Sequence, residues 1–564
     1  MTFTTSFDHP RVSIRDANDL SSKLIGLSKY RTLKEILAQG QSDLDYYDTE
    51  ISLLKKDLHA LEEKRARLHA YLEKCRALNS PIQGLPPELL SEIFALSSNS
   101  MGFGSPYWVP SGKPRDRVAF RLAAVCSRWR NLALSTPGLW SRLEISFSPS
   151  WPSWVPVAID TCLERSGQHV LSVMVEGCLE NLDKTDWQSV LHSLARQAHR
   201  WGSADINLSV PPHLRQECLD RMTLHSFPVL GSLTIGAPGQ WVTLQGHSMF
   251  RNTPKLSTLK LYSEVAANNW RRYDYNITAL TLRGTNLLDT MNILRQCKGL
   301  TSLNYTHAVN KREYSILRNN VEAGVLLPVH LDRLRSLSIF TPQDFISSTM
   351  SLLASLLRLP ALTSLAVEQT FRAAFTEHTL WTAGLWSFLS ITSCSETLTA
   401  LSLKSFMPAD EIDSVLAVVP NLSEFSFHCT SRSTAVEWDG LISCLYLPSH
   451  MPAATDTKAV PIQKKSFIPK LKHLSLHVPN SDAFDLEGFA EAIRSRWMSE
   501  GMPAETAVDC IRSVELKMRR SQLAIIEDDV AFDILLDLEL EGLILAIGVL
   551  APAKTTNLSI FSRD

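Results

Sequence analysis

The amino-acid sequence predicts an α/β protein, in which an N-terminal amphipathic helix and a short helical module are followed by an irregular solenoid of strands and helices. Three observations predict this fold class. A heptad of apolar residues precedes residue 79, two helical patterns lie between residues 85 and 132, and a leucine motif recurs from residue 230 onward. With 564 residues, the chain also exceeds the roughly 250–300 residues at which one hydrophobic core stops growing, so several units are expected.

The composition is that of an ordinary foldable protein without a strong charge preference. Hydrophobic residues make up 45% and charged residues 20% of the chain, which excludes a mainly disordered protein. The formal net charge of −2 gives no long-range attraction to nucleic acid or to an acidic membrane, so neither is expected as a partner. Residues 1–20 are polar and aperiodic, without the apolar core of a secretory signal, and we expect a flexible N-terminus.

The most apolar tract, residues 532–550, is interrupted by four acidic side chains in its first half. Its uncharged part, residues 542–551, is shorter than the roughly 20 residues that a membrane-spanning helix needs. We therefore expect a buried element that closes the core.

The ten cysteines are scattered, and none forms a C-x-x-C pair. Neither a zinc site nor a dense disulfide framework is predicted, and reduced thiols in a cytoplasmic or nuclear protein fit this pattern. The chain also lacks the G-x-x-x-x-G-K-[ST], G-x-G-x-x-G, H-E-x-x-H and G-x-S-x-G motifs of nucleotide, zinc and serine chemistry. We predict no catalytic residue, no cofactor and no metal, and hence a protein that is not an enzyme.

Residues 21–79 are predicted to be an amphipathic helical or coiled-coil region. Arg65 interrupts its apolar seam at one a position, and Asn79-Ser80-Pro81 ends the helix, because proline disfavours the α conformation in the residue before it. Two interpretations stay open, namely self-association through residues 44–75 and a helix folded back on its own chain. The seam alternates at steps of three and four, as a and d positions do, through Leu44, Tyr47, Ile51, Leu54, Leu58, Leu61, Arg65, Leu68, Leu72 and Cys75.

A helix is predicted in the segment Leu85–Ser97 (LPPELLSEIFALS). Its prolines suit a helix start, and Glu88 lies in the first turn, where a carboxylate favours the helix dipole. Leu89, Ile93 and Leu96 share one face of this helix because they are spaced four and three residues apart.

A loop and a second helix are predicted to follow. Residues 98–115 are rich in glycine, serine and proline, which indicates a loop. From about residue 116, apolar residues step by four and three as far as Leu132, which predicts one continuous helix. Thr136-Pro137-Gly138 then breaks the pattern.

The rest of the chain carries an internal repeat. The apolar motif L-x-x-L-x-L occurs nine times between residues 230 and 476, and successive copies up to residue 422 start 21 to 36 residues apart. The end of each motif alternates like a strand, while segments between motifs, such as 351–359 and 411–419, have helical patterns. One strand and one helix cannot bury their apolar faces alone, so stacked copies are needed for a continuous core. This predicts a solenoid over residues 146–564, with a loop near 448–466.

Residues 80–140 resemble an F-box. The matching pieces are Leu85-Pro86-Pro87-Glu88-Leu89-Leu90, Ile93-Phe94, Val125-Cys126-Ser127-Arg128-Trp129-Arg130 and Leu139-Trp140. With the leading heptad helix and the irregular leucine motif, the layout resembles fungal-type F-box proteins that carry a C-terminal leucine-rich-repeat-like domain. The resemblance implies a three-helix F-box, assigned to residues 80–145. The repeats depart from the family because they lack the asparagine that usually follows the third apolar position.

The F-box resemblance implies binding to the small adaptor of SCF ubiquitin ligases, which bridges to a cullin scaffold. For Leu122, Val125 and Trp129, packing inside the module is the competing interpretation, whereas Pro86 and Glu88 have little reason to be buried. The matching positions that imply adaptor contact are Leu85, Pro86, Glu88, Leu89, Ile93, Val125, Cys126 and Trp129.

The predicted function is therefore that of a substrate-recognition adaptor of a cullin-type SCF ubiquitin ligase. The alternative is an interaction scaffold that pairs through its coiled coil and acts outside any ligase. The substrate, an unknown protein, is not identified by the sequence. Candidate contacts are the small polar positions between the apolar ones of each motif, such as Ser257, Thr258 and Lys260, since an extended partner binds along the strands of a solenoid.

Overall fold

The structure of the protein is a computed structural model that describes residues 29–78, 80–97, 101–103, 118–147, 154–179, 184–209, 226–236, 253–262, 276–285, 287–307, 311–324, 326–342, 346–370, 380–405, 412–429, 438–446, 468–478, 484–497, 509–518 and 530–549. These residues belong to two compact units, Met1–Ile93 and Phe94–Asp564. The N-terminus over residues 1–20 and the loop near 448–466, both predicted from the sequence, lie outside the described residues.

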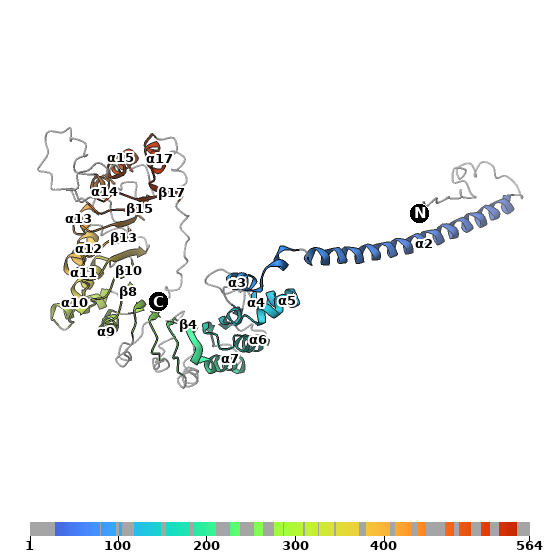
Figure 1. The fold of residues 1–564 in the computed structure, drawn as a ribbon, viewed down its shortest axis with the longest axis horizontal. Helices are drawn as coiled ribbons and strands as arrows, with labels where there is room; N and C mark the ends of the chain where they lie inside the picture. The colour runs from blue at the N-terminus through green and yellow to red at the C-terminus, as the bar shows by residue number, and fades with distance from the viewer. Residues whose placement is uncertain are drawn as a thin grey trace. The chain divides into compact units, whose positions relative to one another are not determined.

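The first unit is dominated by α2 (Lys29–Leu78), a helix of 50 residues (Figure 1). Ion pairs one turn apart, Arg67–Glu63 at 2.5 Å and Arg76–Glu73 at 2.6 Å, lie along it and contribute little each, because all four side chains are exposed. The leucines and the isoleucine of the predicted seam are 44–62% exposed. No helix in the described part of the chain is long and apolar enough to cross a membrane.

A single 3-10 turn, η2 (Pro81–Gly84), separates α2 from α3 (Pro87–Ser97). The α3 helix starts at a proline, and the amide of Leu90 donates to the carbonyl of Pro86 at 3.1 Å, so the first helical bond forms where the sequence predicts. Leu90 and Phe94, four residues apart, are buried.

The second helix of the module was predicted to be continuous, and that prediction is wrong. The structure has α4 (Val118–Val125) and α5 (Ser127–Leu134), separated at Cys126. Cys126 has extended backbone angles (φ −157°, ψ 172°), and its sulfur accepts a hydrogen bond from the Trp129 amide at 3.4 Å. The cysteine therefore caps α5, since a cap residue leaves the helical conformation and satisfies an otherwise unpaired amide of the first turn.

The loop predicted over residues 98–115 is also partly wrong. Met101–Phe103 form β1, which pairs in parallel with β2 (Arg142–Phe147). The two strands flank α4, α5 and the short η3 (Pro137–Trp140), so the helical module is followed directly by a sheet. The other residues between 98 and 117 lie outside the described part.

The second unit is built on one parallel sheet of fifteen described strands, hydrogen-bonded in chain order. A separate pair, β9 (Val329–His330) and β11 (Leu357–Arg358), forms a second sheet. After β1 and β2, the large sheet continues with β3 (Leu171–Cys178), β4 (Trp201–Ser209), β5 (Ser232–Ile235), β6 (Thr258–Leu261), β7 (Ala279–Thr285), β8 (Ser302–His307), β10 (Ser336–Pro342), β12 (Ser364–Thr370), β13 (Ala400–Ser405), β14 (Glu424–Cys429), β15 (His473–Val478), β16 (Ser513–Met518) and β17 (Ile544–Val549).

The register of this sheet follows the leucine motif. The second apolar position of one copy pairs with the same position of the next, for example Leu337 with Leu365 and Leu365 with Leu401. These residues are each at most 2% exposed, so the motif forms a continuous apolar row beneath the sheet.

Helices connect most of the strands and cover one face of the sheet; Figure 1 shows α9 to α15 on the same side of the strands from β8 to β15. Parallel strands need such crossovers, and the apolar side of each helix supplies the partner for the leucine rows. The helices are α6 (Val155–Arg165), α7 (Lys184–Arg196), η4 (Ala198–Arg200), α9 (Leu287–Gln296), α10 (Lys311–Glu322), α11 (Ile346–Leu356), α12 (Leu380–Ile391), α13 (Ile412–Leu416), α14 (Asp439–Leu445), α15 (Leu486–Trp497) and α17 (Val530–Leu540).

A ladder of hydrogen bonds, in which serine and threonine recur, joins the residues that precede successive strands. Just before each strand of the large sheet from β6 to β16, one residue donates its amide to the carbonyl of the equivalent residue in the preceding copy, as Thr301 does to Thr278 at 2.8 Å. The hydroxyl of the same residue reaches the same carbonyl, as in Thr301 (2.9 Å), Thr399 (3.1 Å) and Ser423 (3.1 Å). The turns are therefore satisfied from copy to copy without an amide side chain.

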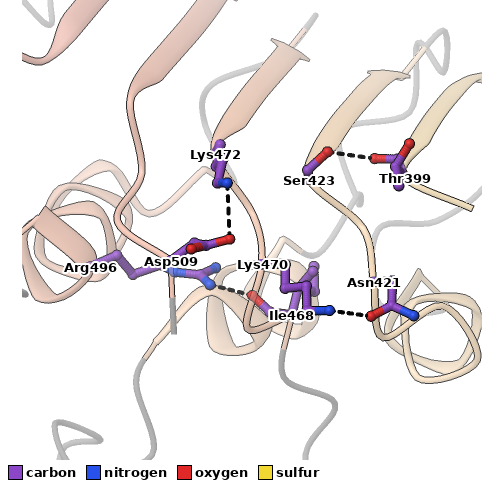
Figure 2. A network of polar contacts seen from close by, with 8 residues as sticks. All are labelled: Thr399, Asn421, Ser423, Ile468, Lys470, Lys472, Arg496 and Asp509. Carbon is purple, nitrogen blue, oxygen red and sulfur yellow. Dashed lines mark hydrogen bonds and ion pairs between the residues drawn. The ribbon is translucent and has the colours of Figure 1, made fainter. Parts of the chain in front are cut away.

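Proline sets the tight turn that precedes many strands. In Phe227-Pro228-Val229-Leu230, the leucine amide donates to the phenylalanine carbonyl at 3.3 Å, and the Thr253 and Leu359 turns repeat this geometry. A proline at the second position of a β-turn already has the required φ. Near β15 the turns are joined by polar contacts, with Lys470 donating to Asn421 (2.6 Å) and Lys472 pairing with Asp509 (3.2 Å) (Figure 2).

Buried Arg496 on α15 belongs to the same network, because its guanidinium donates to the carbonyl of Ile468 at the start of the turn (Figure 2). Burial lowers the pKa of Arg496 to about 10, so the side chain still carries its charge at neutral pH. It ties the end of a covering helix to the sheet.

The C-terminal apolar tract was predicted to be a buried element that closes the core, and this is only partly correct. It forms α17 and the last described strand, β17, separated by Gly542 at φ +111°. Leu535, Leu538 and Leu543 are buried, but Leu540 is 87% and Ile544 67% exposed. The tract therefore packs on the sheet with one face only.

Candidate functional site

The α3 helix presents an apolar surface. Leu89 is 50% and Ile93 44% exposed, although both are apolar. Leu96, a further three residues on, is 76% exposed. Pro86 and Glu88 are exposed at the start of the helix, and Leu85 is half-buried. The helix thus divides into a buried face with Leu90 and Phe94 and an exposed face with the residues that the F-box resemblance singles out.

The junction of α4 and α5 has a similar division. Val125, the last residue of α4, is 60% exposed, which removes the interpretation that it packs in the core. Cys126 and Trp129 are half-buried, and the Trp129 ring packs on Phe94 with 4.8 Å between ring centroids. Leu122 is half-buried. Cys126 therefore stabilises the start of α5 as its cap, in addition to any contact that it makes with a partner protein.

Trp140 holds this helical region together. It is fully buried, and its indole nitrogen donates to the carbonyl of Ala133 at the end of α5 (2.7 Å). The Arg165 guanidinium lies 4.5 Å from the centre of the Trp140 ring, and the Phe120 ring meets Trp140 edge-on at 5.1 Å. These contacts join α4, α5, η3 and α6, so the Leu139-Trp140 piece of the sequence pattern serves packing.

Arg130 supplies a second link within the helical region. Its Nε donates to the carbonyl of Ala123 at 2.9 Å, near the end of α4. This bond satisfies one of the carbonyls that the break at Cys126 leaves without a helical donor. The arginine of the sequence pattern V-C-S-R-W-R thus stabilises the turn between two helices.

The face of the sheet opposite the helices carries a row of titratable side chains, which we call the open row. It consists of Glu368, Lys404, His428, His477 and Lys517, on the adjacent strands β12 to β16 and in direct register. All five are half-buried. Neighbouring strands lie about 4.8 Å apart, so the open row is a continuous polar line across the sheet.

Ion pairs close the two ends of the open row, and histidines occupy its middle. Lys404 pairs with Glu368, Lys517 pairs with Glu515 on its own strand, and the hydroxyl of Ser475 donates to Glu515 at 2.5 Å. The His428 and His477 rings stack with 4.2 Å between centroids.

The surroundings of the two imidazoles favour their neutral form. Burial lowers the pKa of His428 to about 4, and His477, Lys404 and Lys517 add to the shift. The pKa of His477 is lowered as well, first by burial and then by Lys517. The pKa of Glu515 is lowered by its hydrogen bonds with Lys517 and Ser475. An anion placed over the two rings would favour their charged form.

The sequence named other positions on this face. Ser257 uses its hydroxyl in the ladder, as Thr278 and Thr399 do, so its role is structural. Thr258 and Lys260 on β6 are half-buried on the open side of the sheet.

The sequence analysis missed the open row. Its members occupy the position directly after the third apolar residue in successive motifs, so an alignment of the motifs against one another reveals them. Among the described residues, no group of three or more histidine, cysteine or acidic side chains is placed to hold a metal ion.

Comparison with known proteins identifies the helical region. Residues 82–146 match a protein-family model described as F-box-like, which covers η2 to β2 of the structure. No curated protein matches the chain as a whole. F-box proteins are generally adaptors of SCF ubiquitin ligases rather than enzymes. The chain therefore contains an F-box-like domain at residues 82–146.

Proposed function

We propose that this protein is a substrate-recognition adaptor of a cullin-type SCF ubiquitin ligase, acting in the cytoplasm or nucleus. The proposal rests on one observation: within the segment that matches the F-box-like family, apolar residues of the F-box pattern are exposed instead of buried. These residues are Leu89 and Ile93 on α3 and Val125 on α4. Large apolar side chains exposed on a helix need a partner to leave water, and such anchors dominate stable interfaces.

The proposed adaptor-binding residues divide into two kinds. Leu89, Ile93 and Val125 are exposed and supply apolar contact, and Pro86 and Glu88 are exposed and supply contact at the start of α3. Leu85, Cys126 and Trp129 are half-buried, and we propose that they support the surface as well as touch the SCF adaptor. The cysteine and the tryptophan are joined by the hydrogen bond that caps α5.

Calorimetry with the full-length chain and the purified SCF adaptor tests this proposal. We expect saturable binding, and we expect the Leu89→Asp/Ile93→Asp double variant to lose it, because two carboxylates cannot be desolvated in an apolar interface. Val157→Asp is the matched control, since Val157 is 67% exposed on α6, outside the proposed surface. If the wild-type chain, shown to be folded by circular dichroism, fails to bind, the proposal is wrong.

We further propose that the substrate binds the open face of the sheet, with the open row at the centre of the contact. Support comes from the concentration of charged and neutral donors there, and from the ladder, which holds the strand spacing fixed. A preformed row of this kind loses little entropy when a protein segment lies across the strands.

Proteomics of ubiquitinated proteins tests the substrate face. In cells that express Lys404→Ala/His428→Ala/His477→Ala in place of the wild type, we expect the substrates to lose ubiquitin and accumulate. Arg494→Ala is the control, because Arg494 is exposed on α15, one of the helices that cover the opposite face of the sheet. An identical set of ubiquitinated proteins in the triple variant and the wild type would remove the open row from the proposal.

The second candidate function is an interaction scaffold that acts outside any ligase. The exposed seam of α2 favours it, since an apolar stripe of this length is typical of a helix with a partner helix. The two functions differ in one observable, because the scaffold requires no SCF adaptor.

A further inference from the structure

The seam of α2 is long, apolar and uncovered by the described residues. The a and d side chains from Leu44 to Leu72 include six leucines and one isoleucine, each 44–62% exposed. A helix of 50 residues that exposes such a stripe gains most of its stability only when a second helix covers it. Because the stripe repeats every seven residues, the covering helix must be a coiled-coil partner.

We propose that this partner is the α2 helix of a second copy of the chain, and that the two helices run antiparallel. The charges beside the seam select this arrangement. In an antiparallel pair, e positions face e positions and g positions face g positions, whereas in a parallel pair each g position faces the e position five residues further along the partner.

The parallel arrangement places like charges together. Asp57 would face Glu62 of the second copy, and Asp43 would face Asp48, each twice in a symmetric pair. Glu50 opposite Lys55 is the one attractive contact between fully charged side chains. The a-position Arg65 would also meet Arg65 of the second copy in the same core layer, which places two guanidinium groups within a closed apolar seam.

The antiparallel arrangement centred between residues 59 and 60 removes these conflicts. Lys55 then faces Glu62 of the second copy, and Asp57 faces Lys64, each twice. Asp48 faces His69, and no like charges meet at the e and g positions between residues 48 and 71. Shifting this pairing by one heptad either way brings like charges together, Lys55 on Lys55 in one direction and Glu62 on Glu62 in the other.

The core layers agree with this register. Leu58 packs on Leu61 of the second copy, Ile51 on Leu68, and Arg65 on Leu54 instead of on another arginine. The aliphatic part of Arg65 can cover the leucine while its charged end reaches water at the edge of the seam. The ion pair Arg67–Glu63, on the outer side of α2, is unaffected.

The arrangement has a consequence for the proposed function. The C-terminal ends of the two helices, each leading to Pro81, lie at opposite ends of the pair. Residue 78 is level with residue 41 of the second copy, so the two ends are about 55 Å apart at 1.5 Å per residue. The pair therefore carries two F-box-like domains, one connected at each end.

Disulfide trapping in the full-length chain distinguishes orientation. Native Cys75 is exposed, lies at a d position, and faces Leu44 of the second copy in the antiparallel pair. Under mild oxidation we expect Leu44→Cys to give a covalent dimer with a 44–75 link, identified by peptide mass spectrometry. The wild type, with Cys75 alone in the seam, is expected to give no 75–75 link.

Two control variants make every outcome decisive. Leu44→Cys/Cys75→Ser should give no link between the seams, and Thr49→Cys, on the outer f position, should give none to Cys75. A 75–75 link in the wild type, or a 44–44 link in Leu44→Cys/Cys75→Ser, would show a parallel pair and overturn the orientation.

Light scattering tests the pairing itself, and its readout is independent of SCF adaptor binding. We expect twice the chain mass of 63.0 kDa at micromolar concentration, and one chain mass for Leu58→Asp/Leu61→Asp. A wild-type chain that stays at one chain mass would overturn self-pairing and leave the seam to a helix of another protein.

Discussion

Two adjacent leucines on α3 are expected to respond in opposite ways to the same substitution. Leu89 is 50% exposed and Leu90 is completely buried, although they are neighbours in the sequence. Leu90→Ala removes buried methyl groups and leaves a cavity, which costs about 2–5 kcal/mol of stability. Leu89→Ala changes stability by less than about 1 kcal/mol, because half of the side chain is already in water.

The effect on SCF adaptor binding is expected to be reversed. Leu89 belongs to the proposed surface, so Leu89→Ala should weaken binding by about 1–2 kcal/mol, which is a 5- to 30-fold rise in Kd. Leu90→Ala should lower the fraction of folded domain while leaving the affinity of the folded part unchanged. Hydrogen exchange of the amides of α3 to α5 measures local stability, and calorimetry measures Kd. An unchanged Kd for Leu89→Ala, or exchange as slow in Leu90→Ala as in the wild type, would refute the assignment of faces.

Three further predictions follow from buried contacts in the second unit. The guanidinium of Arg200 holds the end of α6, because it donates to the Ser166 hydroxyl (2.9 Å) and to the carbonyls of His169 (3.0 Å) and Leu163 (2.9 Å). Arg200→Leu should therefore lower the free energy of unfolding by about 2–4 kcal/mol, measured by local hydrogen exchange. Arg196→Leu is the control and should cost little, because Arg196 is exposed. Trp140→Phe keeps the ring stack but loses the hydrogen bond to Ala133, so it should lower the free energy of unfolding by about 1 kcal/mol. Trp140→Ala should lower it by about 3–5 kcal/mol, and urea unfolding measures both values. Equal losses for the two variants would contradict the packing role of the ring. Folding lowers the pKa of His428 to about 4, so on acidification the unfolded chain takes up the His428 proton before the folded chain does. The stabilising contribution of neutral His428 is therefore complete above pH 6.5 and is lost as the pH falls toward 4. His428→Gln should flatten this part of the stability–pH profile, and a pKa near 6.5 for the folded His428, measured by histidine hydrogen exchange, would contradict the burial argument.

The strand register could be predicted from the sequence because the leucine motif has a strict internal spacing. Alternation within L-x-L assigns the buried face, and the recurrence of the motif aligns one strand with the next, so Leu337, Leu365 and Leu401 meet in the structure. The shared face of Leu89 and Ile93 on α3 also follows from the sequence, because helical spacing places residues four apart on one side. Leu89 and Ile93 lie one turn apart, and both are exposed.

The features that could not be predicted depend on weak local signals. The apolar spacing runs through Cys126 without a change of phase, so the pattern alone gives one helix, and a thiol is an uncommon capping acceptor. The ladder uses serine and threonine, which occur throughout the chain and mark no position by themselves.

The open row was hidden by irregular spacing. His428 and His477 stack although 49 residues separate them in the sequence, because a long insertion lies between β14 and β15. Only the shared position after the third apolar residue connects them. Pairwise contact of this kind depends on which strands are neighbours, and a single motif does not contain that information.

Assembly with the ligase scaffold tests the proposed role most directly. Analytical ultracentrifugation of the full-length chain, the SCF adaptor and the cullin, alone and in all combinations, shows which components move together. We predict that the chain sediments with the cullin only when the SCF adaptor is present, and that Leu89→Asp/Ile93→Asp abolishes this co-sedimentation. A folded chain that sediments apart from the cullin in the presence of the SCF adaptor would contradict the adaptor role and favour the scaffold.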